Sequence, residues 1–502
     1  MAESPMPSSF AERYDCVIAG GGPAGAVLGL LLARAGLNIL LLEKHGDFLR
    51  DFRGDTIHPA TLELLDQLGL ADRFLQLPHS EVHQVTMPGR SGLVGFSFRN
   101  LPSKYRFVAF VPQWDFLNFI TDEAKRYPGF HLLMNAEVTD LVVEDGVVRG
   151  VHYRTADGEH TALAQLTVGA DGRTAITRTV AGLRPIENGV PMDVLWFRIS
   201  RRPDEPASLV GRTAPGRFGA QINRGDYWQV AYIIPKGGID AVHAAGLPAF
   251  RQDVAALMPE LADRVDELQD WDQVKLLTVQ SNRLPVWWVP GYLAIGDAAH
   301  AMSPVGGVGI NLAIQDAVEA ANVLWRPLRE GRVTTADLAA VQRKRDVPTR
   351  IIQELQNLMQ RQVIAPTLAG ASAFGDGDAL LALSHLPLLR DLPPRLIGLG
   401  VGRPRVSSPE VGDGEVIPLT SASAPSSLPE QQLASALLGT AFAGAGVVRM
   451  ARSRAQEATP EAGGRERIPG VDALGLLLLG AGVSLLAPLV RSWREGRRAA
   501  ST

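Results

Sequence analysis

Apolar residues near the start of the chain follow the order of a strand, a turn, a helix and a second strand. Residues 14–19 form a short apolar run, and after several glycines residues 26–35 have the nearly continuous apolar character of a buried helix. Gly36 ends that helix, and residues 38–42 form the next apolar run. This order predicts a βαβ unit and therefore the start of a doubly wound α/β sheet.

The middle of the chain changes from mixed helices and strands to short alternating runs. The pattern first predicts helices over 60–68 and 114–126 and strands over 136–144 and 150–153. Further strands are expected over residues 194–199, 218–223, 227–234 and 274–280, with a helix over 247–268. These later runs predict an antiparallel sheet domain inserted into the doubly wound domain, to which the chain returns at 292–295 and 311–324.

Composition shifts divide the chain into five segments. The sequence after residue 400 is rich in Gly, Pro and Ser, which is typical of a flexible linker. The expected segments are 12–190 (doubly wound domain, first part), 191–290 (inserted β-sheet domain), 291–400 (return to the first domain, with helices), 401–430 (linker) and 431–502 (an apolar tail flanked by arginines).

The tail carries two uncharged stretches, 433–448 and 473–490. The second has the minimum length for a membrane span, and four arginines follow it within residues 491–498. The tail is therefore expected either to contact a membrane through residues 433–490 or to form helices that pack on the enzyme or on a second subunit.

Composition and charge narrow the function classes. The 502 residues are 46% hydrophobic and 20% charged, as in globular proteins, and the net charge of -4 gives no reason to expect a nucleic acid partner. The single cysteine, Cys16, excludes an intrachain disulfide and zinc sites built on several thiolates, and no metal site is predicted. Because the first residues lack a secretory pattern, the body of the protein is expected in the cytoplasm.

The glycines after the first strand match the pattern GxGxxG. Gly20 suits the tight turn, Gly22 allows a pyrophosphate to approach the backbone, and Gly25 allows the helix to pack on the strand. Pro23 and Ala24 begin the helix, whose free N–H groups attract phosphates. Glu43, followed by Lys44, ends the second strand, where a carboxylate can accept both hydroxyls of an adenosine ribose. We therefore expect a dinucleotide, the alternative being a glycine-rich turn without a ligand.

Two later motifs distinguish between dinucleotides. Asp171-Gly172 follows a strand, and residues 292–311 read YLAIGDAAHAMSPVGGVGIN, including Gly296-Asp297. With the GxGxxG, these motifs follow in the order and at the separation found in the class A flavoprotein monooxygenases of the para-hydroxybenzoate hydroxylase type. The chain resembles this family over about residues 12–345.

The resemblance implies a fold and a set of FAD contacts. The fold would be a Rossmann-like FAD-binding domain of the glutathione reductase type with an inserted antiparallel sheet. Asp297 would hold a ribityl hydroxyl, and Asp171-Gly172 would serve the pyrophosphates of FAD and NAD(P)H. The loop past the isoalloxazine edge would include Pro304, Gly307, Gly309, Ile310 and Asn311. Arg53 and Gln113 match family positions near the cofactor. The alternatives are that Arg53 is a surface arginine and that Gln113 caps a helix.

The resemblance also implies the chemistry. NAD(P)H would reduce the flavin, O2 would form a flavin C4a-hydroperoxide, and one oxygen atom would pass to an aromatic, quinol or polyketide-like ring. The absence of a separate nicotinamide domain in the sequence agrees with this family. Two alternatives stay open: a reductase of the geranylgeranyl reductase type that does not use O2, and a flavin-binding sensor or interaction protein without turnover.

Candidate catalytic residues follow Arg53. Asp55 and His58 lie in the segment that the family places beside the flavin ring, and His58 could act as a base for a phenol because imidazole titrates near neutrality. The alternative for His58 is a helix-start residue before Pro59. In the inserted sheet, alternation predicts that one of two sets of side chains lines the substrate pocket, without deciding which. The candidates are Val194, Trp196, Arg198, Gln221, Tyr227, Gln229 and Tyr232.

Overall fold

The computed structural model describes residues 12–49, 56–89, 92–205, 209–370, 391–412 and 415–417. The chain divides into two units, residues 1–419 and 420–502, and all described residues belong to the first. Arg53, Asp55 and the tail lie outside the described residues, so the expectations for them stay predictions. Within the described ranges, no helix combines the length and apolar character needed to cross a membrane.

The first sheet contains the parallel βαβ unit that the sequence predicts. Its main strand order is β19-β20-β11-β1-β2-β8, and β1 pairs in parallel with both β2 and β11. Strands β9 and β10 extend it beside β11. The bounds are β1 Glu12–Ala19, β2 Ile39–Glu43, β8 Phe130–Met134, β9 Glu137–Glu144, β10 Val147–Thr155, β11 Gly158–Gly169, β19 Trp288–Val289 and β20 Tyr292–Ala294.

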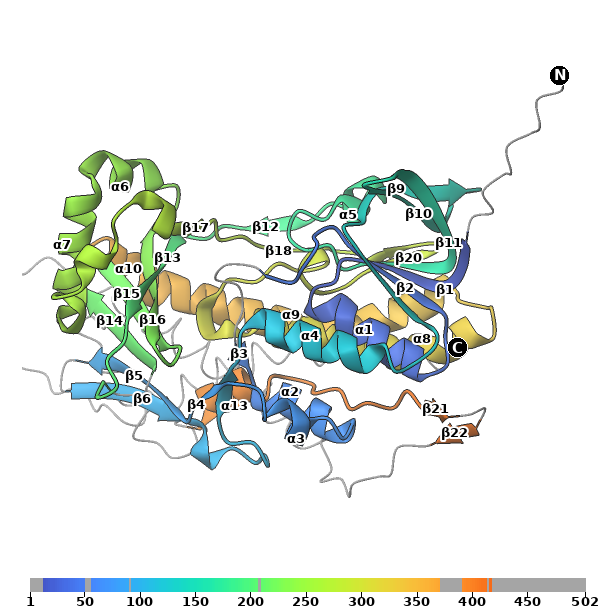
Figure 1. The fold of residues 1–502 in the computed structure, drawn as a ribbon, viewed down its shortest axis with the longest axis horizontal. Coiled ribbons are helices and arrows are strands. Elements are labelled where there is room, and N and C mark those ends of the chain that lie inside the picture. Colours follow the sequence, from blue (N-terminus) through green and yellow to red (C-terminus); the bar gives the residue numbers. More distant parts are fainter. Residues whose placement is uncertain are drawn as a thin grey trace, which may run out of the picture. The chain divides into compact units, whose positions relative to one another are not determined.

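Three helices pack together on one side of this sheet (Figure 1). Helix α1 (Pro23–Arg34) contacts both α4 (Gln113–Ala124) and α8 (Gly309–Arg329). Residues 16–19 of β1 and all of β2 are buried, as expected for parallel strands covered on both faces. Cys16 is one of these core residues, and burial raises the pKa of its thiol.

The second sheet is larger than the predicted insertion. Its order is β17-β13-β16-β15-β14-β5-β6. Strands β5 and β6 come from the segment assigned to the first domain, and β5 pairs in parallel with β14 at Leu209↔Val85. The second sheet therefore also includes residues from before position 191. The bounds are β5 Gln84–Gly89, β6 Gly92–Ser97, β13 Met192–Ser200, β14 Leu209–Ala214, β15 Arg217–Asn223, β16 Tyr227–Pro235 and β17 Lys275–Leu277.

The helix expected over 247–268 is shorter than predicted. Helix α7 covers Leu247–Leu257 and follows α6 (Ile239–Ala245), and two 3-10 turns then occupy 259–261 and 265–267. Pro259 explains the break, because a proline disfavours helical geometry at the preceding residue and lacks an N–H donor. The predicted strand over 274–280 is likewise limited to the three residues of β17.

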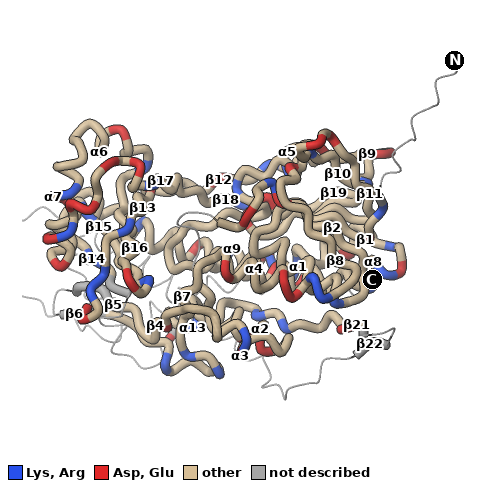
Figure 2. The backbone as a smooth tube through the Cα atoms, viewed as in Figure 1, with Lys and Arg blue, Asp and Glu red and all other residues tan. Residues whose placement is uncertain are grey.

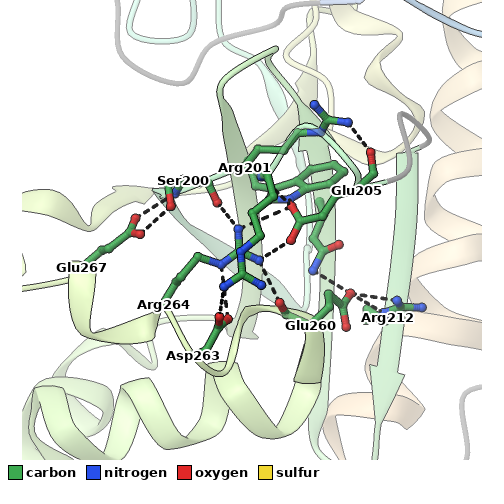
Figure 3. Close-up of polar contacts among 11 residues, drawn as sticks. Ser200, Arg201, Glu205, Arg212, Glu260, Asp263, Arg264 and Glu267 are labelled. Carbon is green, nitrogen blue, oxygen red and sulfur yellow. Dashed lines mark hydrogen bonds and ion pairs between the residues drawn. The ribbon is translucent and has the colours of Figure 1, made fainter.

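Charged side chains fix the segment after α7 to the sheet (Figure 3). The buried Arg264 forms an ion pair with Glu205 and donates to the carbonyl oxygen of Ser200. Glu260 accepts hydrogen bonds from Arg212 and from the side chain of Gln221. Elsewhere basic and acidic residues are interspersed along the described chain (Figure 2).

Several smaller elements also belong to the first unit. A three-stranded sheet contains β3 (Thr56–Ile57), β7 (Val108–Phe110) and β4 (Ser80–Val82), and β12 (Ile186–Asn188) pairs with β18 (Ser281–Arg283). Helix α9 (Thr335–Met359) continues through a π-helical turn (Gln360–Ile364) into α10 (Ala365–Leu368). The other helices are α2 Pro59–Gln67, α3 Ala71–Phe74, α5 Ile176–Val180 and α13 Leu392–Gly398.

Residues 401–412 differ from the expected linker. Arg34 donates to the carbonyl oxygen of Ser408 (3.1 Å), and Asn322 donates to that of Arg405 (2.7 Å). Val406 is buried, and its N–H donates to the side chain of Gln67. This stretch is therefore packed on α1, α2 and α8, although its composition resembles that of a linker.

Candidate functional site

The glycine turn after β1 depends on close backbone contacts. Gly20 has a φ of +106°, and a Cβ there would overlap the carbonyl group of Ala170. A Cβ on Gly25 would overlap the carbonyl oxygen of Gly20. By contrast, a Cβ on Gly22 would meet nothing within 4 Å. The turn is therefore tight on its protein side and open at Gly22, where α1 begins with Pro23 and Ala24 and has no side-chain cap.

Glu43 lies at the end of β2, beside this turn. Its carboxylate accepts hydrogen bonds from the N–H of Gly21 (3.0 Å) and of His45 (3.1 Å), and His45 Nδ1 lies 2.6 Å from Oε1. Lys44 is exposed. The carboxylate is thus oriented by two backbone N–H groups and by the His45 ring.

Asp171 is held by the start of α5. Its carboxylate accepts from the N–H of Thr177 (3.0 Å) and from its hydroxyl (2.9 Å), and burial raises the pKa of Asp171. Gly172 has a φ of +87°, and a Cβ there would have open space around it. Ala170 and Asp171 border Gly20, so this motif and the glycine turn are neighbours.

Gly296-Asp297 lies in a 3-10 turn against the start of α1. Gly296 has a φ of +59°, and a Cβ there would press on Ala24 and Ala313. Asp297 is partly exposed, and Arg173 Nε lies 3.2 Å from its carboxylate. Arg173 was not predicted, although it directly follows Asp171-Gly172.

A fully buried ion network supports this turn from behind. Asp316 accepts from the Gly296 N–H (3.1 Å), and its carboxylate lies 2.5 Å from His300 Nε2 and 2.8 Å from Arg345 Nε. Burial alone would raise the pKa of Asp316, but His300 and Arg345 hold it below its ordinary value. The network fixes the turn to α8 and α9.

The loop from Pro304 to Asn311 is joined to the start of α2. Thr56 Oγ1 donates to the Gly307 carbonyl (2.8 Å), and Gly307 has a φ of +62°. The side-chain oxygen of Asn311 accepts from the His58 N–H (3.0 Å) and the Thr61 hydroxyl (2.7 Å). Gly309 and Ile310 are the first two residues of α8, so this helix begins at the loop as the resemblance implies.

His58 is buried and immediately precedes α2. Its ring Nδ1 lies 2.6 Å from the Ile397 carbonyl oxygen, which requires a proton on Nδ1. Burial lowers the pKa of His58 to about 4. This placement agrees with the helix-start interpretation, while a role as a base stays a prediction. Gln113 was predicted together with Arg53 as a cofactor contact. It is the half-buried first residue of α4.

The structure sorts the predicted pocket side chains onto two faces of the second sheet. Val194 and Ile233 pack in one cluster with Val305 of the loop and Ile364. Tyr232 packs toward α7, and Gln221 bonds to Glu260 on that same side. By strand register, the face toward the loop carries Val194, Trp196, Arg198, Tyr227 and Gln229.

These features fit FAD. The open Gly22 and the uncapped start of α1 could accept a pyrophosphate, and Arg173, Glu43 and Asp297 could supply further charged contacts. The loop at the start of α8 adjoins the sheet face that is rich in apolar side chains. A long, bent cofactor could therefore extend from the turn to that face.

Comparisons with known proteins agree with this geometry. A family model described as an FAD binding domain matches residues 13–354. The 6-methylpretetramide 4-monooxygenase of Streptomyces rimosus is 31% identical over 420 residues, covering 83% of this chain and 99% of that protein. The rifampicin monooxygenase of Streptomyces venezuelae is 28% identical over 328 residues, covering 62% of this chain and 63% of that protein.

Solved structures support the same fold. The anhydrotetracycline hydroxylase OxyS from Streptomyces rimosus has a TM-score of 0.61 at 21% identity, covering 77% of this chain and 76% of that one. PqsL of P. aeruginosa, in complex with 2-aminobenzoylacetate, has a TM-score of 0.61 at 19% identity, covering 71% and 97%. The predicted fold class is confirmed. The chain belongs to the FAD-binding-domain family of class A flavoprotein monooxygenases, and is an FAD-dependent enzyme that uses NAD(P)H as reductant.

Proposed function

We propose that the enzyme hydroxylates a phenolic ring of a planar, polyketide-derived aromatic substrate. The observation that carries this proposal is the relation to 6-methylpretetramide 4-monooxygenase, which extends over 99% of that protein. The reaction would convert substrate, O2, NAD(P)H and a proton into hydroxylated substrate, water and NAD(P)+. One oxygen atom enters the product, and the two electrons of NAD(P)H reduce the other to water.

The sheet face beside the loop supports a flat, apolar substrate. Val194, Ala231 and Ile233 line it together with the partly buried Trp196 and Phe218. In contact with a substrate, such side chains would favour aromatic rings and exclude water from the reacting atoms. Arg198 and Gln229, opposite each other on adjacent strands, would offer polar contacts near one edge of the ring system.

The FAD contacts are part of the same proposal. The glycine turn would bind the pyrophosphate, Glu43 the adenosine ribose, and Asp297 a ribityl hydroxyl. The loop 304–311 would offer N–H groups to the flavin ring, and bound FAD would supply the activation of O2. Arg53 and Gln113 are proposed as further contacts. No proton transfer is assigned to Asp55 or His58.

The test measures three quantities with 6-methylpretetramide and anhydrotetracycline as probes: substrate-dependent NAD(P)H oxidation, O2 uptake and product mass. We expect O2 consumption and a product that gains one oxygen atom, labelled when 18O2 is used. NAD(P)H oxidation and substrate reduction without O2 uptake would support the reductase alternative. Absence of any substrate-stimulated oxidation across a wider phenolic panel would contradict the proposal.

A further inference from the structure

One face of α9 and the π-helical turn carries a row of buried polar side chains. The row contains Arg345, Thr349, Gln353, Gln356 and Gln360, at spacings of four, four, three and four residues. Such spacings place side chains on one side of a helix. Every member is at most 4% exposed. A buried polar row has to find hydrogen-bond partners, because each unmet group destabilises the fold.

Two members of the row donate hydrogen bonds to the backbone in and before the loop 304–311. The Nε2 of Gln353 donates to the carbonyl oxygens of Asn282 (2.8 Å) and Ala301 (3.3 Å). The Nε2 of Gln356 donates to those of Ser303 and Val305, both at 2.8 Å. These two amides therefore fix α9 to the segment that leads into the loop.

Gln360 lacks partners at both ends of its amide, whereas Gln353 and Gln356 lack one only at Oε1 among the described residues. Gln360 is 1% exposed, and among the described residues neither its Nε2 nor its Oε1 has a hydrogen-bond partner. It is also the first residue of the π-helical turn, a rare feature that is frequent at functional sites. A carboxamide with both ends unmet is costly in an apolar interior and calls for an explanation.

The neighbours of Gln360 locate it between the loop and the substrate sheet. One turn before it, Gln356 bonds to the Val305 carbonyl. One turn after it, Ile364 belongs to the apolar cluster that contains Val305, Val194 and Ile233. Gln360 thus lies where the loop expected at the flavin ring adjoins the face expected to hold the substrate.

We propose that Gln360 is a specificity-determining residue whose carboxamide binds a paired carbonyl and hydroxyl on the edge of the aromatic substrate. Its Nε2 donates to the carbonyl oxygen and its Oε1 accepts from the hydroxyl, and both unmet groups are then satisfied. Adjacent carbonyl and hydroxyl groups are a common edge of polyketide-derived phenols. This inference rests on the proposed function and names the feature of the substrate that the site selects.

The test compares Gln360→Met with Gln356→Met in the FAD-loaded enzyme. Methionine nearly conserves the volume of glutamine but removes the amide. We expect Gln360→Met to raise KM for 6-methylpretetramide about tenfold, with kcat within about twofold and an unchanged Tm or a higher one. Gln356→Met is the matched control, and its Tm should fall because the amide bonds to Ser303 and Val305 are lost.

Substrate methylation provides a second measurement. Methylation of the hydroxyl that is paired with the carbonyl should raise KM for the wild type. It should leave KM of Gln360→Met nearly unchanged, because that variant already lacks the contact with this hydroxyl. Equal KM values for wild type and Gln360→Met, or a lower Tm of Gln360→Met, would overturn the inference, since the amide would then be satisfied within the protein or by water. A wild-type enzyme that hydroxylates no phenol would instead overturn the proposed function together with this inference.

Discussion

The glycine turn and the substrate sheet are held in place by opposite kinds of contact. At the turn, Gly20 and Gly25 allow two backbone segments to approach until no Cβ fits between them. In the sheet domain, Arg264 and Glu205 join segments 59 residues apart through long charged side chains. The turn is therefore sensitive to added atoms, whereas the sheet domain is sensitive to the removal of a partner.

Arg264→Met should have the largest effect on stability. Glu205 would remain mostly buried without its cation, and such a loss lowers the free energy of unfolding by about 3–5 kcal/mol. Urea denaturation followed by tryptophan fluorescence measures the change. The control is Arg154→Met, whose exposed pair with Glu159 contributes at most about 1 kcal/mol. A similar loss of unfolding free energy in both variants would contradict the view that burial makes the Arg264–Glu205 pair the more important one.

Gly25→Ala should come next and should act on the other region. The new Cβ would overlap the Gly20 carbonyl, so that α1 has to move away from β1 at a cost of about 1–3 kcal/mol. Because that movement distorts the glycine turn, we expect the purified protein to lose the yellow colour of bound flavin. Full retention of FAD with unchanged Tm would show that the turn tolerates the added atom.

Gly22→Ala separates ligand binding from folding in the same turn. Its Cβ meets nothing within 4 Å, so the Tm of the FAD-free protein should change little. If a pyrophosphate occupies the open side, the dissociation constant of FAD should rise about tenfold, measured by quenching of flavin fluorescence. An unchanged FAD affinity would place the pyrophosphate elsewhere.

Substitution of His58 should have the smallest effect on stability at neutral pH among these variants. The pKa of about 4 lies below the ordinary value of 6.5, so folding favours the neutral ring. As the pH falls from 6.5 toward 4, the unfolded chain binds a proton at His58 that the folded protein does not bind. The free energy of unfolding therefore falls in this window. His58→Asn should flatten the dependence of Tm on pH in that window. From pH 7 to 9 its kcat/KM profile should keep the wild-type shape, and a lost inflection there would instead support the role as a base.

The parts of the fold that the sequence predicts are those that depend on nearby residues. The strand, glycine turn and helix from β1 to α1 follow from apolar runs and from glycines a few positions apart, and the fold class is confirmed. The resemblance also located the loop at Asn311, which the structure brings to Thr56 and His58. Its contacts with FAD remain proposals.

The parts that were not predicted depend on distant partners. The pairing of Val85 with Leu209 joins two strands that look like local hairpins, and no local pattern indicates it. Residues 401–412 have the composition of a linker, yet a few hydrogen bonds to Arg34, Gln67 and Asn322 hold them. The Gln360 side chain was not predicted because a glutamine on a helix normally suggests a solvent-exposed position.

The double attachment of Asn311 has an evolutionary consequence. Its amide accepts from the start of α2 and donates to the Thr56 and Gly307 carbonyl oxygens, so one side chain joins segments about 250 residues apart. A substitution that shifts the backbone of one of these two segments would disturb the hydrogen bonds of Asn311 to both segments. Adaptation to a new substrate should therefore proceed by paired changes in these two segments, with each single change less fit than the pair.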